Sequence, residues 1–238
     1  MDASQILGCM DNEWSHKLRK MSSAAPPPIE FIRQFHHGTT DVADCNLERA
    51  LQISAAAEKR SASLPSLLRR FGNQNFSFGG MPFRHLREIF RIVTPRPDQL
   101  FCDAGAGYGH VVFYGACVSP CRFRAIEILP ARYNAMIRTG HRLGFKDIEI
   151  VRGDALAQSY DDVDYLFLNN PFFPDLAKRF IDRLTAARQR PLTVIAMHNI
   201  VDVLRGNAAF TEIEISADIP DYCFGVFVLK RPGGTALA

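Results

Sequence analysis

The sequence predicts an α/β protein with a mainly parallel sheet of seven strands, preceded by an α-helical N-terminal extension. From about residue 94, short apolar runs alternate with segments of helical periodicity, which is typical of a parallel sheet covered on both faces. A glycine-rich turn at residues 105–109 joins the first such run to a helix. The last two runs, 212–215 and 223–229, have no helix between them, so we expect an antiparallel hairpin at the sheet edge.

The remaining elements follow from the same patterns. Strands are expected near residues 99–103, 123–128, 147–151, 163–169 and 192–197, and helices near 82–93, 109–118, 130–143, 174–188 and 199–205. The first third shows no strand pattern, and helices are expected near 1–24, 29–35, 42–60 (capped by Asp41) and 66–71. We therefore divide the chain into a helical extension, residues 1–75, and an α/β domain, residues 76–238.

Composition excludes several classes of protein. The 238 residues are 47% hydrophobic and 22% charged, which is ordinary for a globular protein, and the formal charge of +3 does not by itself indicate nucleic acid. No apolar run approaches the roughly 20 residues that span a bilayer, so no membrane partner is expected. The six cysteines form no C-x-x-C pair, which predicts reduced thiols, no metal site and a cytoplasmic location.

The segment 101–109, FCDAGAGYG, carries the first candidate ligand site. Asp103 ends the strand, and Gly105, Gly107 and Gly109 follow at alternate positions. Glycines there let a ligand approach the backbone, although the same pattern also suits a tight turn that binds nothing. The spacing resembles the cofactor loop of class I S-adenosylmethionine (SAM) methyltransferases. It fits the dinucleotide fingerprint G-x-G-x-x-G less well, because His110 holds the sixth position.

Two further acids follow strand ends. Glu127 ends the second strand, about 20 residues beyond the glycine loop, where a carboxylate can accept both ribose hydroxyls; the alternative is a cap for the helix that begins at Pro130. Asp154 follows Gly153 after the third strand and can accept the amino group of adenine, or it belongs to a common turn. We predict that both acids bind the cofactor.

The segment 167–174, FLNNPFFP, ends the fourth strand and is the most specific signal after the glycine loop. Its position at the carboxyl edge of a parallel sheet is where ligands bind. Asn170 can accept hydrogen bonds from an amine nucleophile, and Phe172 or Phe173 can pack against its alkyl stem or against a sulfonium. We assign Asn170, Pro171 and Phe173 to catalysis and Asn169 to cofactor binding; the alternative is a plain strand end with a proline turn.

Two histidines are weaker candidates. His198 follows the fifth strand and can bind substrate or take up a proton, but a histidine bonded to a backbone carbonyl is the more common arrangement. His110 can cap the glycine loop or contact the carboxylate of SAM. Neither is assigned to the site.

Residues 77–198 resemble the class I SAM-dependent methyltransferases, and among them the non-SET histone-lysine type and bacterial relatives with an Asn-Pro-Phe motif. The resemblance lies in the motifs already given together with Phe78-Gly79, Val111-Val112, residues 131–133 and residues 152–156. It implies a Rossmann-like seven-stranded sheet, SAM as cofactor and methyltransferase activity. The motif at Asn170 also partly matches the N-P-P-[YF] signature of adenine-N6 and glutamine-amide methyltransferases, with Phe172 in place of the second proline.

From these features the sequence predicts a SAM-dependent N-methyltransferase with a protein side chain, preferably lysine, as acceptor. A nucleic-acid base is the alternative, with a possible basic face formed by Arg69, Arg70, Arg84, Arg87 and Arg91, which otherwise form a solvated helix surface. A non-catalytic binding module with the same fold is a third reading, against which the intact acids and glycines argue. The oligomeric state is left open.

Overall fold

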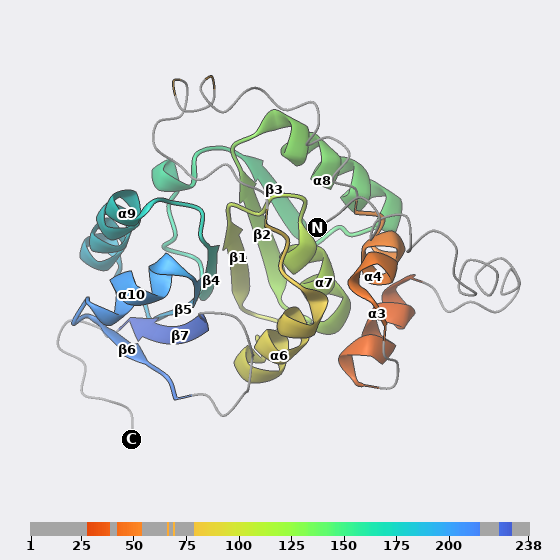
Figure 1. The fold of residues 1–238 in the computed structure, drawn as a ribbon, viewed down its shortest axis with the longest axis horizontal. Helices are drawn as coiled ribbons and strands as arrows, with labels where there is room; N and C mark the ends of the chain where they lie inside the picture. Colours follow the sequence, from red (N-terminus) through yellow and green to blue (C-terminus); the bar gives the residue numbers. More distant parts are fainter. Residues whose placement is uncertain are drawn as a thin grey trace, which may run out of the picture.

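The computed structural model describes residues 28–38, 42–53, 66, 69, 79–214 and 224–229, which form a single sheet with helices on both faces (Figure 1). The strands are β1 Leu100–Ala104, β2 Arg122–Glu127, β3 Ile148–Arg152, β4 Tyr165–Asn169, β5 Leu192–Met197, β6 Phe210–Glu212 and β7 Phe224–Leu229. The helices are α3 Pro28–His36, α4 Asp44–Ala50, α6 Phe83–Val93, α7 His110–Val118, α8 Pro130–Leu143, α9 Pro174–Ala187 and α10 Asn199–Arg205.

The strand order β3-β2-β1-β4-β5-β7-β6 confirms the predicted sheet. Strands β1 to β5 pair in parallel, whereas β7 runs antiparallel to both β5 and β6. The chain leaves β1 toward β3 and then returns to place β4 on the other side of β1. This reversal creates a crevice at the carboxyl ends of β1 and β4, which is where open α/β sheets bind their ligands.

Alternate residues of the strands pack into two separate halves of the core. Phe101, Phe123 and Phe167 are buried on the face covered by α6, α7 and α8. Cys102 and Leu166 are buried on the opposite face, which α9 and α10 cover (Figure 1). Because both faces are covered, the central strands are apolar at nearly every position rather than alternating with polar residues.

The described part of the N-terminal extension shares the first of these cores. Ile32 and Phe35 of α3 and Leu47 of α4 are buried against α6 and α7. The predicted helix at 42–60 is shorter than expected: α4 begins after Ala43, which is its N-cap, and Gln52 adopts a positive φ of 53°. Asp41, the expected cap, lies outside the described residues, as do 1–27, 54–60 and the proposed domain boundary near residue 75.

Two arginines of the suggested basic face hold α3 in place. The guanidinium of Arg87 lies 4.9 Å from the centre of the Phe35 ring, and Arg91 donates a hydrogen bond of 2.7 Å to the carbonyl of His36. Both side chains also pair with Glu88. They therefore serve packing within the protein, while Arg70 lies outside the described residues. Within the described ranges, no helix combines the length and hydropathy needed to span a membrane.

Candidate cofactor and acceptor site

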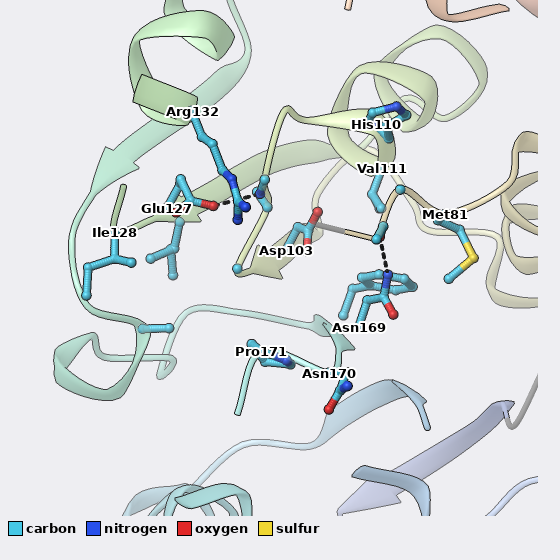
Figure 2. A pocket seen from close by; sticks show the side chains of 18 of the residues that line it. Met81, Asp103, His110, Val111, Glu127, Ile128, Arg132, Asn169, Asn170 and Pro171 are labelled. Atoms are coloured by element: carbon cyan, nitrogen blue, oxygen red, sulfur yellow. Dashed lines mark hydrogen bonds between the residues drawn. The ribbon is translucent and has the colours of Figure 1, made fainter. Parts of the chain in front are cut away.

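A cavity of about 220 Å³ lies at the carboxyl ends of the central strands, at the predicted crevice. Figure 2 shows Ile128 toward one end and Met81 toward the other, with Glu127 and Asp103 between them. The lining residues are Gly79, Gly80, Met81, Asp103, Gly105, Ala106, Gly107, His110, Val111, Ile126, Glu127, Ile128, Arg132, Gly153, Ala155, Phe167, Asn169, Asn170, Pro171, Phe172 and His198. Loops after β1, β2, β3, β4 and β5 thus all contribute to one site.

The glycine loop has the backbone that its composition predicts. Gly105, Gly107 and Gly109 have φ values of 91°, 59° and 85°, in the region that favours glycine. A Cβ on Gly105 would lie only 2.9 Å from the Cβ of Pro171. The glycine loop therefore touches the Asn-Pro motif directly, and a side chain at position 105 is excluded for both steric and dihedral reasons.

Glu127 anchors this loop from the end of β2. Its carboxylate accepts a 2.9 Å hydrogen bond from the Gly107 N–H and a 2.8 Å bond from the Leu129 N–H, and the residue is 3% exposed. Burial raises its pKa, an effect that the backbone hydrogen bonds and the nearby Arg132 oppose. A carboxylate has about four acceptor positions, so Glu127 can also accept hydroxyl hydrogens from a ligand in the cavity.

Arg132 is a site residue to which sequence reasoning assigned no role. It is 5% exposed, lines the cavity and has its guanidinium carbon 5.9 Å from the centre of the Tyr108 ring. Its side chain runs toward Glu127 (Figure 2). A signal was present in the sequence: Arg132 is in the first turn of α8, where a cation opposes the helix dipole, so it indicates a nearby anion.

Asp103 ends in the middle of the cavity and is almost completely buried. Burial, and to a smaller extent the charge of Glu127, raises the pKa of Asp103 to about 8. At neutral pH the ligand-free protein therefore holds a carboxylic acid at this position. A cationic ligand would favour its ionised form.

Replacing Asp103 should change how stability depends on pH. Between about pH 4 and 8 the folded protein retains a proton that the unfolded chain releases, so the free energy of unfolding falls as pH rises. Asp103→Asn removes this titration and should raise the melting temperature at pH 8 by about 5 °C or more. Melting curves of both proteins from pH 4 to 9 measure the effect. Parallel pH profiles for parent and variant would contradict it.

The motif after β4 forms the part of the wall next to the glycine loop. Asn169 donates a 3.2 Å hydrogen bond to the carbonyl of Gly79, which fixes the segment before α6 against the strand end. Asn170 has a positive φ of 52°, and His198, after β5, has a φ of 55°. Such backbone conformations cluster at functional sites. Both residues line the cavity beside Pro171 and Phe172.

Three of the predicted site residues lie outside the cavity lining. The Asp154 carboxylate caps the short 3-10 helix 155–157 by accepting from the Leu156 N–H at 2.9 Å. Gly109 is the N-cap of α7, where a Cβ would meet the Phe113 ring at 2.5 Å. Phe173 precedes α9 and is 43% exposed at the surface. The other assigned residues, Asp103, Gly105, Gly107, Glu127, Asn169, Asn170 and Pro171, all line the cavity.

Comparison with solved structures identifies the fold. An RNA methyltransferase from Salinibacter ruber, in complex with S-adenosyl-L-homocysteine, is 14% identical with a TM-score of 0.50, covering 67% of this chain and 98% of that one. A SAM-dependent O-methyltransferase from Thermotoga maritima is 14% identical with a TM-score of 0.51, covering 74% of each chain. The chain has the SAM methyltransferase fold.

A third structure extends the similarity further along the chain. A human methyltransferase 10 domain-containing protein is 12% identical with a TM-score of 0.51, and the match covers 85% of this chain and 97% of that one. No protein-family model matches the sequence, and no curated protein matches it either. The predicted Rossmann-like sheet is confirmed, whereas the specific resemblance to the histone-lysine type is not. Among the described residues, no cluster of three or more histidine, cysteine or acidic side chains could hold a metal ion.

Proposed function

We propose that this protein is a SAM-dependent methyltransferase that modifies the exocyclic amino group of a nucleic-acid base. One observation carries the proposal: a single cavity is lined by the glycine loop, the buried Glu127 carboxylate and the Asn170-Pro171 turn. The first two suit the cofactor and the third suits an amino acceptor. The similarity to methyltransferase structures supports the cofactor assignment.

The donor set fits SAM. Glu127 offers carboxylate oxygens to ribose hydroxyls, and each hydrogen bond to a charged group contributes about 1.5–3 kcal/mol. Gly105 and Gly107 line the cavity without side chains, so a ligand can approach the backbone of the loop there. Asp103 lies within the same cavity and favours a cation over a neutral ligand once it ionises. Bound SAM supplies an electrophilic methyl group on a cationic sulfur.

The acceptor side requires orientation more than acid-base chemistry. Transfer of a methyl group from sulfonium sulfur needs no acid for the leaving group, so holding the nucleophile in line is the main task. The Asn170 amide oxygen can accept an N–H bond and orient the amino nitrogen. The amino group of a base is neutral at pH 7, whereas a lysine ammonium must first lose a proton.

Phe173 favours a planar acceptor. It directly follows Phe172 of the cavity wall, yet it leaves 43% of its surface exposed. A channel for a lysine side chain would enclose this ring, whereas an exposed ring offers a face on which a base can stack. The Salinibacter ruber structure is that of an RNA methyltransferase, which agrees with this preference. We therefore place the nucleic-acid acceptor ahead of the protein side chain that the sequence favours.

Incubation with labelled SAM and cell extract tests the proposal. We expect label in macromolecules that nuclease releases and protease does not, because the proposed acceptor is a nucleic-acid base. Calorimetric titration of the purified protein with SAM provides the companion measurement. Label released only by protease would restore the protein acceptor, and the absence of any SAM binding would remove the cofactor assignment.

A further inference from the structure

Helix α4 of the N-terminal extension contacts the end of the cavity where Met81 and His110 lie. Asp44 and Glu48 are four residues apart and so share one face of the helix. The Asp44 carboxylate accepts a 3.2 Å hydrogen bond from the Phe83 N–H, and Glu48 lies 3.0 Å from Nε2 of His110. One face of α4 therefore holds the first turns of both α6 and α7.

The contact with Glu48 fixes the position of His110. His110 is 4% exposed, lines the cavity and packs with its ring centre 5.7 Å from that of Phe83. A carboxylate only accepts hydrogen bonds, so Nε2 carries the hydrogen in this pair. Such a partner sets the orientation of the ring and favours its protonated form, in which both nitrogens donate. The Glu48 carboxylate is itself about half exposed, so it is not needed to fill the core.

The residues that line the cavity give its two ends different chemistry. Ile128 follows β2, and Gly153 and Ala155 follow β3, so all three lie on the same side of β1; they offer apolar surface and backbone groups, which suit a purine ring. Glu127 lies between the ends, where its carboxylate could accept the ribose hydroxyls. The other end, with Met81 and His110, is then left for the amino-acid portion of the cofactor (Figure 2). That portion carries a carboxylate. The imidazolium form of His110 can donate Nε2–H to Glu48 and Nδ1–H to that carboxylate.

We propose that Glu48 is a positioning residue that holds His110 where it binds the carboxylate of the SAM amino-acid portion. The N-terminal extension thereby completes the cofactor site. This inference rests on the proposed function, because it assumes that the cavity binds SAM.

Two ligands separate this role from general support of the fold. S-adenosylhomocysteine carries the amino-acid carboxylate, whereas 5′-methylthioadenosine lacks the whole amino-acid portion. Glu48→Ala should lower the affinity for S-adenosylhomocysteine about tenfold, as expected for one lost charged hydrogen bond. The affinity for 5′-methylthioadenosine should stay within about twofold of that of the parent. Glu48→Gln should recover part of the loss, because its amide oxygen still accepts from Nε2–H. Glu30→Ala, which removes an exposed acid from α3, serves as the control and should bind both ligands like the parent.

The outcomes are distinguishable from one another. Equal weakening of both ligands by Glu48→Ala would show that α4 only supports the fold, and unchanged S-adenosylhomocysteine affinity would remove Glu48 from the site. Either result overturns the inference while the proposed function stands. A parent protein that binds neither ligand would overturn both. Melting temperatures of the ligand-free variants, measured alongside, report how far Glu48 contributes to stability.

Discussion

Gly105→Ala should reduce SAM affinity by at least about 100-fold, which corresponds to about 2.7 kcal/mol. The new methyl group would lie 2.9 Å from the Cβ of Pro171, and the residue would have to keep a φ of 91°. Pro171 cannot move aside easily, because its side chain is a rigid ring in the wall of the cavity. The loop must therefore move, and it takes with it the Gly107 N–H that Glu127 holds.

Gly144→Ala provides the matched control for this substitution. Gly144 also has a positive φ, of 73°, but nothing lies within 4 Å of a Cβ built there. It caps the far end of α8, so alanine imposes a similar backbone cost of about 1–3 kcal/mol without touching the site. Titration of both variants with SAM should show the large loss for Gly105→Ala alone. Equal affinities would mean that the contact with Pro171 does not shape the site.

Asn170→Ala should lower the rate of methyl transfer about ten- to a hundredfold while leaving SAM affinity within a few-fold. Glu127 and the glycine loop are the groups that suit SAM, whereas Asn170 lies on the β4 side beside Pro171. Losing one oriented hydrogen bond to the acceptor costs about 1–3 kcal/mol in the transition state. Single-turnover methyl transfer, compared with SAM titration, measures the two effects separately.

The backbone of Asn170 requires a second variant. Its φ of 52° suits asparagine and glycine better than alanine, so Asn170→Ala also introduces strain. Asn170→Gly removes the amide and keeps the backbone relaxed. Loss of turnover in both variants assigns the effect to the amide, whereas normal turnover in the glycine variant would assign it to strain. Equal losses in affinity and rate would place Asn170 in the cofactor site instead.

The fold and part of the site were predictable because they depend on local sequence patterns. Apolar runs of strand length and segments of helical period place the elements of the sheet domain, and the turn between β1 and α7 requires residues that accept a positive φ. Glu127 follows from the same reasoning, because the carboxyl ends of parallel strands meet at one edge of the sheet. Each of these inferences needs only neighbouring residues and the direction of the strand.

Other features depend on distances between segments that are far apart in the sequence. The 2.9 Å approach of position 105 to Pro171 and the pairing of Glu48 with His110 arise only when the sheet and its helices are packed together. The sequence also did not predict the direction of two side chains. Asp154 caps the short helix that follows it, and Phe173 is exposed at the surface. The sequence by itself determined which strands and turns form and that an acid stands at the end of β2. Tertiary packing alone decided which side chains share the cavity, because that depends on rotamers and on contacts across the sheet rather than on local periodicity.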